Sequence, residues 1–420
     1  MRAVRAAIAA WAVLAAGLAG GSAAQTAPAA PAGPDYDLDL TLDPGTGGIA
    51  VEAVITLSPE DAADGAGFLI GPTYVVSAVQ ADPGVTASVG PAPMPGVQRL
   101  SVGPVPDAQG PVRVRLSYAG RPSDGDGANA VTPGRTELSA DSLWWPLPDV
   151  FNTRVTYRLT LRGLAPGTEV ASPDVVTREG ETVRIVRQAP SQDIAFTASP
   201  DFQRVVDGDL TILAQDPESD LLKAYRTNGA AALAFFEAWF GPLPTGRAVI
   251  AFPRRPSGSG YSRPGYLVVA DVGTIDAANL WGRYGYVAHE LSHAWWSSAD
   301  FTSQDYWLVE STAEYSALRF MESRLGREPV EAILERKRPR AATGGAILGD
   351  GRPSNAAVYA RGPLLLVALE QRIGRERMDA LLGGLARRRV LTTADFLTAL
   401  AGISDDATAH AFEAELRATP

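Results

Sequence analysis

WGRYGYVAHELSHAWWS, at residues 281–297, carries the clearest pattern in the chain. Its apolar residues recur every three or four positions, which predicts one helix over the whole stretch. Within it, HELSH at 289–293 holds two of the three histidines of this 420-residue protein. On a helix, His289 and His293 lie on one face, one turn apart, with Glu290 beside them. Both imidazoles can therefore reach the same metal ion.

The HExxH pattern is the one with which zinc hydrolases hold their metal, and its glutamate lies close to the metal-bound water. The alternative interpretation is two surface histidines on a helix. Histidine is so scarce in this chain that a chance pairing at this spacing is a poor explanation. The pattern therefore favours a site for one Zn²⁺ per chain, bound by His289 and His293.

A third protein ligand must come from elsewhere in the chain. A continuation with a further histidine is excluded, because Trp296 and Ala299 occupy the positions where it needs glycine and histidine. His410 lies in an Ala/Glu-rich helical stretch near the C-terminus and is expected on the surface. Carboxylates remain, and the candidates are Asp300, Asp305, Glu310 and Glu314.

Glu310 is favoured among these carboxylates because it opens a second helical pattern, residues 306–325, after a short loop. Glu314 follows four residues later, so it can accept a hydrogen bond from a ligating imidazole while Glu310 binds the metal. The alternative is a solvated helix face that carries two glutamates.

These residues also carry a family resemblance. HELSHAWWS at 289–297 and WLVESTAEY at 307–315 resemble the HELAHQWFG and WLNEGFAEY segments of the aminopeptidase N family of gluzincin zinc metallopeptidases. The spacer between them is slightly shorter than in the family. The resemblance implies His289, His293 and Glu310 as zinc ligands, and Glu290 as the catalytic carboxylate.

Two further segments of the chain correspond to known segments of this family. VYARGPL at 358–364 resembles its VYEKGxL segment, which implies that Tyr359 donates a hydrogen bond to the oxyanion. SGSGYSRPGY at 257–266 stands where the family has its GxMEN segment, whose glutamate binds the substrate amine. Gly260, Tyr261 and Ser262 are then candidate substrate-binding residues without that carboxylate. The same loop can also be a β-turn between apolar strands at 247–253 and 266–272.

The remaining sequence predicts an α+β protein. Apolar and β-branched alternation over residues 35–205 predicts a β-sandwich, similar to the saddle-like N-terminal domain of the family. Trp144 and Trp145 are expected in its core. Helical patterns dominate residues 206–420, which match the order of a mainly helical, thermolysin-like catalytic domain. The later C-terminal domains of the family are not expected.

The N-terminus has the composition of an export signal. Residues 1–24 combine Arg2 and Arg5 with an apolar run and a small-residue cleavage site, and the Ala/Pro-rich residues 25–34 suggest a flexible leader. A retained anchor is the alternative, and no other segment is a transmembrane candidate. Together with the Arg-rich, Lys-poor composition, this predicts a bacterial protein that is periplasmic or secreted.

These observations predict a zinc peptidase in which Glu290 assists the attack of a metal-bound water on a peptide or protein substrate, with altered recognition of the substrate amine. The alternatives are an inactive or non-proteolytic scaffold of the same fold and hydrolysis of a non-peptide amide. A net charge of −10 argues against nucleic acid as a partner, and the basic runs at 336–340 and 387–389 are expected to be solvated helix faces. The oligomeric state stays open.

Overall fold

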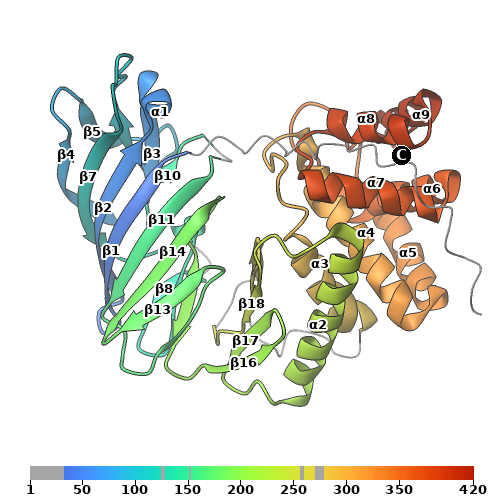
Figure 1. Ribbon diagram of the computed structural model, residues 1–420, viewed down its shortest axis with the longest axis horizontal. Helices are drawn as coiled ribbons and strands as arrows, with labels where there is room; N and C mark the ends of the chain where they lie inside the picture. The colour runs from blue at the N-terminus through green and yellow to red at the C-terminus, as the bar shows by residue number, and fades with distance from the viewer. Residues whose placement is uncertain (1–32, 124–127, 151–152, 256–259, 270–278) are drawn as a thin grey trace, which may run out of the picture.

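The computed structural model describes residues 33–420, apart from 124–127, 151–152, 256–259 and 270–278. The predicted signal peptide and most of the predicted leader lie outside these residues. The described chain forms a sheet-rich N-terminal part and a helical C-terminal part that lie side by side (Figure 1). The predicted α+β class and the order of the two parts are confirmed.

A seven-stranded sheet forms the larger layer of the N-terminal part. In its central strands, β1, β2, β7 and β11, buried residues alternate with more exposed ones; in β1, for example, Tyr36, Leu38 and Leu40 are buried. This period of two buries one face and leaves the other face solvated. In spatial order the strands are β13 (Val175–Glu179), β14 (Thr182–Ser191), β11 (Val155–Arg162), β1 (Asp35–Asp43), β2 (Gly48–Leu57), β7 (Val112–Gly120) and β4 (Tyr74–Ala81).

Two four-stranded sheets complete this part. Trp144 and Trp145 are fully buried in its core, as predicted, and the ring of Trp145 meets Tyr36 edge-to-face at 5.4 Å between centroids. One sheet contains β10 (Leu147–Pro148), β3 (Ala66–Ile70), β6 (Gln98–Val102) and β5 (Ala87–Pro91), and the other contains β12 (Glu169–Ala171), β15 (Phe196–Ser199), β9 (Thr136–Leu138) and β8 (Ala130–Val131). Two short helical segments, α1 (Pro59–Ala63) and η1 (Ala140–Ser142), lie between strands.

A five-stranded sheet begins the C-terminal part. Its order is β16 (Gln203–Asp207), β17 (Leu210–Ala214), β18 (Ala248–Ala251), β20 (Tyr266–Val268) and β19 (Tyr261–Arg263). β18 and β20 are parallel, so they are not the two antiparallel strands that a β-turn would join. The tight turn instead lies at Pro264 and Gly265, between β19 and β20. Residues 270–272 of the predicted second strand lie outside the described residues.

The other regular elements of the described C-terminal part are helices (Figure 1). They are α2 (Asp220–Phe240), α3 (Tyr286–Ser292), α4 (Trp307–Leu325), α5 (Arg327–Ala341), α6 (Gly362–Ile373), α7 (Arg375–Arg388), α8 (Thr393–Ile403) and α9 (Asp406–Arg417). Three shorter turns, η3 (Trp281–Gly285), η4 (Gln304–Tyr306) and η5 (Ala357–Arg361), adjoin α3, α4 and α6. His410 is exposed on α9, as the sequence indicates.

The long helix α2 supports the helix that carries the HExxH residues. Gly229 of α2 is buried, and a Cβ added there would meet Val287 and Leu291 of α3, each at 3.6 Å, and Leu210 of β17 at 3.0 Å. Because residue 229 is glycine, α2 and α3 approach closely over one apolar core. This packing holds one face of α3 in place. Its opposite face is left for the histidines.

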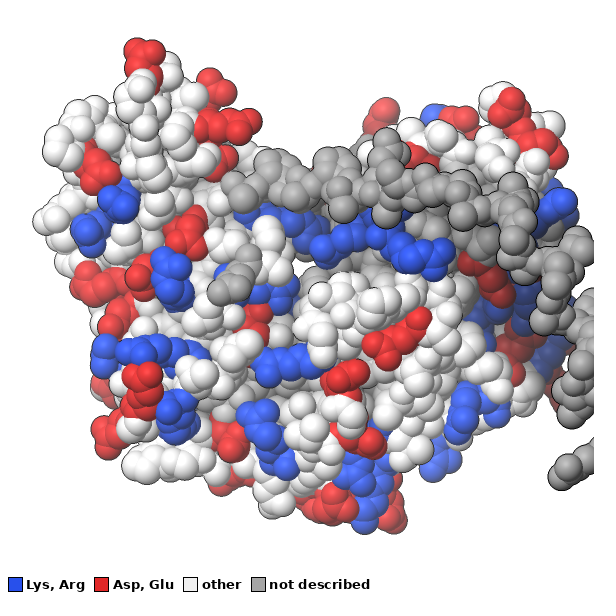
Figure 2. All heavy atoms as spheres, viewed as in Figure 1, with Lys and Arg blue, Asp and Glu red and all other residues white. Residues whose placement is uncertain are grey.

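The surface carries both signs of charge. On the face shown in Figure 2, acidic and basic side chains are interspersed over both parts, with a row of basic side chains near their junction. None of the helices in the described residues is both long enough and apolar enough to cross a membrane.

Candidate metal centre

The helix of the HExxH residues is shorter than the sequence predicts. Residues 281–285 form a π-helical turn, α3 runs from Tyr286 to Ser292, and His293 is its C-cap. A Cβ on Gly285 would overlap the indole ring of Trp281, so glycine makes room for this ring inside the wide turn. The prediction of one continuous helix over 281–297 is therefore wrong at both ends, although both histidines keep their one-turn spacing.

The second element of the site is α4. It carries Glu310 and Glu314 one turn apart, and both side chains are buried, with 10 % and 5 % of their surface exposed. This burial excludes the alternative of two glutamates on a solvated helix face. Buried carboxylates require a positive or hydrogen-bonding partner, so this face of α4 is built around one.

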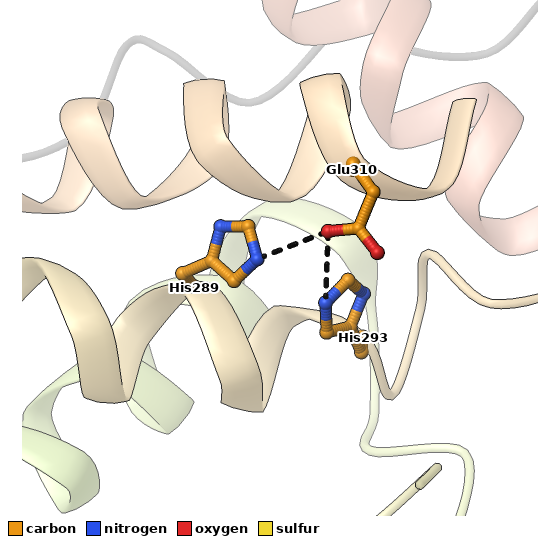
Figure 3. Close-up of side chains that lie close together, drawn as sticks. All are labelled: His289, His293 and Glu310. Carbon is orange, nitrogen blue, oxygen red and sulfur yellow. Dashed lines mark ion pairs between the residues drawn. The ribbon is translucent and has the colours of Figure 1, made fainter. Parts of the chain in front are cut away.

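Glu310 meets both histidines (Figure 3). Its Oε2 lies 3.3 Å from Nε2 of His289 and 3.7 Å from Nε2 of His293. All three ligand atoms lie within 4.8 Å of one another. The structure thus brings together, from α3 and α4, the three residues that the sequence predicts as ligands.

The geometry and chemistry of this trio fit zinc. Tetrahedral ligands at about 2.0–2.1 Å from Zn²⁺ stand about 3.3–3.5 Å apart, close to the two distances from Glu310. Oε2 of Glu310 is buried and accepts no hydrogen bond from the described residues. Two imidazoles and one carboxylate are also a ligand set that catalytic zinc sites use.

The other nitrogen of each imidazole faces an acceptor. Nδ1 of His289 lies 2.8 Å from Oε2 of Glu314, and Nδ1 of His293 lies 3.1 Å from the carbonyl oxygen of Trp296. An acceptor beside Nδ1 favours the proton on that nitrogen, which would leave the lone pair of Nε2 free for a metal ion. The structure thus places Glu314 where the sequence analysis expects it.

Electrostatics favour a positive charge inside this trio. Burial by itself lowers the pKa of His289, but the carboxylates of Glu310 and Glu314 outweigh it and raise this pKa to about 10. Burial would raise the pKa of Glu310, but His293, His289 and the hydroxyl of Tyr306 together lower it to about 2. A divalent cation supplies the positive charge that these carboxylates favour.

Two tyrosines lie next to the trio. Tyr306 donates a hydrogen bond to Oε1 of Glu310 at 2.8 Å, and its hydroxyl oxygen is 3.4 Å from that of Tyr359. The Tyr359 ring lies 5.9 Å from the His289 ring. Burial, followed by the charge of Glu310, raises the pKa of Tyr359 far above its ordinary value. Tyr359 therefore stays protonated and can donate a hydrogen bond to an oxyanion.

Tyr359 is held in place by a close contact between η5, the π-helical turn at the start of α6, and α4. A Cβ on Gly362 would overlap the side chain of Ser311, whose hydroxyl donates a hydrogen bond to the carbonyl oxygen of Val358 at 2.8 Å. The glycine of the VYARG segment thus lets the backbone beside Tyr359 lie directly against α4.

A cavity of about 420 Å³ opens beside these residues and is called the metal-site pocket below. It contains Glu290 and Tyr359 together with one of the histidines, and its volume lies within the usual range for a small-molecule site. Its lining residues are Asn279, Trp281, Tyr286, His289, Glu290, Glu314, Ile333, Arg336, Lys337, Arg340, Tyr359 and Ala360.

Residues 260–262 lie against α3. Ser262 donates a hydrogen bond to the carbonyl oxygen of Glu290 at 3.2 Å, and a Cβ on Gly260 would meet the hydroxyl of Tyr286 and the carbonyl of Val268, each at 2.6 Å. The hydroxyl of Tyr261 is buried without a hydrogen-bond partner among the described residues. The three candidate substrate-binding residues therefore adjoin the site, and none of them is a carboxylate.

Sequence reasoning missed two residues of the site. Tyr306 precedes Glu310 by one helical turn, a spacing that could have identified it. Lys337 of α5 pairs with Glu314, donates a hydrogen bond to the carbonyl oxygen of Tyr359 at 3.0 Å, and lies 4.9 Å above the Trp281 ring. Its only signal was the scarcity of lysine, which occurs in this chain at 223 and 337.

No protein-family model matches this chain, and no curated protein sequence does either. Solved structures do match. A two-domain M1 zinc metallopeptidase variant bound to L-arginine superposes with a TM-score of 0.70 at 17 % identity, over 92 % of this chain and 95 % of that one. An M1 zinc metallopeptidase variant from Deinococcus radiodurans, bound to a Tyr-Ser-Ala substrate, gives 0.68 at 18 % identity, with the same coverage.

A longer protein shares the same fold. Native leukotriene A4 hydrolase from Saccharomyces cerevisiae matches with a TM-score of 0.72 at 15 % identity, over 93 % of this chain and 68 % of that one. At these identities the likeness establishes the fold. The chain has the two-domain fold of the M1 zinc metallopeptidases, the group to which aminopeptidase N belongs, as the resemblance of its motifs predicts.

Proposed function

We propose that this chain is a zinc-dependent peptidase of the aminopeptidase N type, in which Glu290 assists the attack of water on a peptide bond. The observation that carries the proposal is the convergence of His289, His293 and Glu310 on one point beside a pocket that also contains Glu290 and Tyr359. The M1 metallopeptidase solved with a bound tripeptide substrate supports a peptide as the substrate class.

Each residue of the site has a distinct part in this reaction. A zinc ion bound to the three ligands would lower the pKa of a water molecule to about 7. Glu290, half-buried in the pocket, accepts a proton from the attacking water and passes it to the leaving amine. Tyr359 donates a hydrogen bond to the carbonyl oxygen on which negative charge develops, and such a donor contributes about 2.7–4 kcal/mol to the barrier reduction.

Glu290→Gln is the variant that tests this function. We expect the purified wild type to hold about one zinc per chain and to hydrolyse short peptides, and the variant to keep the metal but lose nearly all turnover. Glu335→Gln is the matched control, because Glu335 is exposed and pairs with Arg338 on α5. Full activity of Glu290→Gln would refute the assigned role. A wild type that binds peptides without hydrolysing them would favour the scaffold alternative.

We further propose that the substrate amine is recognised differently from the family pattern. The segment at Gly260, Tyr261 and Ser262 has no carboxylate to pair with an ammonium group, and Ser262 is engaged with the backbone of Glu290. Rates on free and N-acetylated peptides of one sequence test this proposal. We expect at most a small preference for the free amine, and a large loss of rate on acetylation would refute it.

Export is proposed from the sequence of residues 1–24, which lie outside the described part of the structure. The charged start, the apolar run and the small-residue end are typical of a secretory signal. N-terminal sequencing of the mature protein from a bacterial periplasm tests this proposal. We expect the chain to begin near Gln25, and an intact Met1 on a protein retained in the cytoplasm would contradict it.

A further inference from the structure

Two sides of helix α5 line different cavities. Arg336, Lys337 and Arg340 line the metal-site pocket. A second groove, bounded by α4, α5 and α6, is lined by α5 residues of both charges, namely Arg327, Glu331, Glu335 and Arg338. The sequence predicts a solvated helix face for this basic run; Arg336 and Arg340 are exposed, and they also line the pocket.

The basic side chains of the pocket differ in whether they form ion pairs. The charge of Lys337 is offset by Glu314. Arg336 and Arg340 are exposed, and neither forms an ion pair with any residue in the described part of the chain. Arg338, by contrast, points to the second groove and forms an ion pair with Glu335 at 2.9 Å. The pocket therefore has two guanidinium groups that form no ion pair with a described side chain, and the carboxylate of Glu290 in the same pocket forms none either.

Guanidinium groups match carboxylates in charge and in hydrogen-bonding geometry, and a concave site concentrates their field. The pocket also contains Glu290 and Tyr359, which are the residues proposed to act on the scissile bond. Anything that contacts Arg336 or Arg340 inside this pocket therefore lies within a short stretch of peptide from that bond. The apolar floor beside them, formed in part by Trp281 and Ile333, is suited to the body of such a peptide.

We propose that Arg336 and Arg340 form a subsite for a carboxylate of the peptide substrate. This inference rests on the proposed function and gives it a substrate class: short peptides that carry a negative charge near the cleaved bond. The charge can come from a free C-terminus or from an Asp or Glu side chain. Both sources present the same carboxylate to the two guanidinium groups.

Binding is measured in the zinc-loaded Glu290→Gln background, so that the result does not depend on turnover. The probes are trialanine as the free acid, trialanine with a C-terminal amide, and the same amide with glutamate as its last residue. We expect at least one carboxylate peptide to bind about tenfold more tightly than the trialanine amide at low salt, the effect of one partly exposed charge-assisted hydrogen bond. The preference should shrink as salt is added.

The arginines are tested as Arg336→Ala/Arg340→Ala, with Arg338→Ala as the matched control from the same helix. We expect the double variant to abolish the preference for a carboxylate, and Arg338→Ala to retain it. Preference for the free acid alone assigns the subsite to the C-terminus, and preference for the glutamyl amide assigns it to a side chain.

Equal binding of all three peptides, or a preference that survives in the double variant, would overturn the inference. Because the experiment measures binding, a failure of the carboxylate subsite can be distinguished from a failure of the proposed peptidase function. In that second case the wild type would hydrolyse none of the peptides.

Discussion

The Glu314–Lys337 ion pair contributes both to the stability of the helical part and to the affinity of the site for its metal. Its side chains are 5 % and 16 % exposed, and the carboxylate faces both the Lys337 ammonium and Nδ1 of His289. Glu314→Gln keeps the size of the side chain and removes its charge. The lysine is then left nearly buried without a counter-ion, which costs about 3 kcal/mol, the lower end for broken buried pairs because Lys337 is partly exposed.

The double variant Glu314→Gln/Lys337→Gln separates two effects. Replacing both charges leaves two amides that can hydrogen-bond each other, so the free energy of unfolding should return to within about 1 kcal/mol of wild type. Zinc affinity should not return. A neutral amide supports the Nδ1 proton of His289 less than a carboxylate does, and we expect a loss of about 10–100-fold in both variants.

Two assays measure these effects. Urea unfolding of the metal-free protein gives the stability, and competition with a chromophoric chelator gives the zinc affinity. Glu335→Gln on α5 is the control and should change neither, because its ion pair with Arg338 is exposed. A double variant no more stable than Glu314→Gln would refute the pairing argument. Recovery of zinc affinity together with stability would refute the role of Glu314 on His289.

Three further substitutions probe the surroundings of the metal centre. Gly362→Ala forces a methyl group against Ser311 and should cost about 1–3 kcal/mol of stability while displacing Tyr359; a thermal melt within error of wild type would contradict this contact. Tyr359→Phe should lower kcat by about 10²–10³-fold with zinc content unchanged, and an unaltered kcat would remove Tyr359 from the reaction. Tyr306→Phe should weaken zinc binding about 10-fold, because Oε1 of Glu310 loses its 2.8 Å hydrogen bond; chelator competition measures this, and unchanged affinity would show that the bond does not orient the ligand.

The pairing of His289 with His293 could be predicted from the sequence because their relation is local, whereas Glu310, on another helix, was predicted from the helical pattern at 306–325 and the family resemblance. His289 and His293 depend on a one-turn spacing, and the same rule places Glu314 one turn after Glu310. Lys337 escaped prediction because it reaches the site from α5, and no periodic pattern links it to Glu314. Contacts of this kind depend on how helices pack against one another, which a single sequence does not specify.

In the fold, too, features set by local sequence could be predicted, and features set by tertiary contacts could not. Long alternating strands such as β2 and β7 are the kind of pattern that predicted a β-rich region over 35–205, whereas β8 and β10 are too short for any period to be seen. Apolar spacing over 281–297 predicted one helix and could not show the π-helical turn before α3. That turn depends on Gly285 accepting the Trp281 ring, a contact that spacing alone does not reveal.

The anomalous scattering of a crystal of the purified protein at the zinc absorption edge tests the central claim most directly. We predict one strong peak in the anomalous difference map, about 2.0–2.2 Å from Nε2 of His289, Nε2 of His293 and a carboxylate oxygen of Glu310. The peak should be absent from crystals of His293→Ala grown under the same conditions. A zinc-replete crystal of the wild type without a peak at this point, or with its zinc bound elsewhere, would contradict the account.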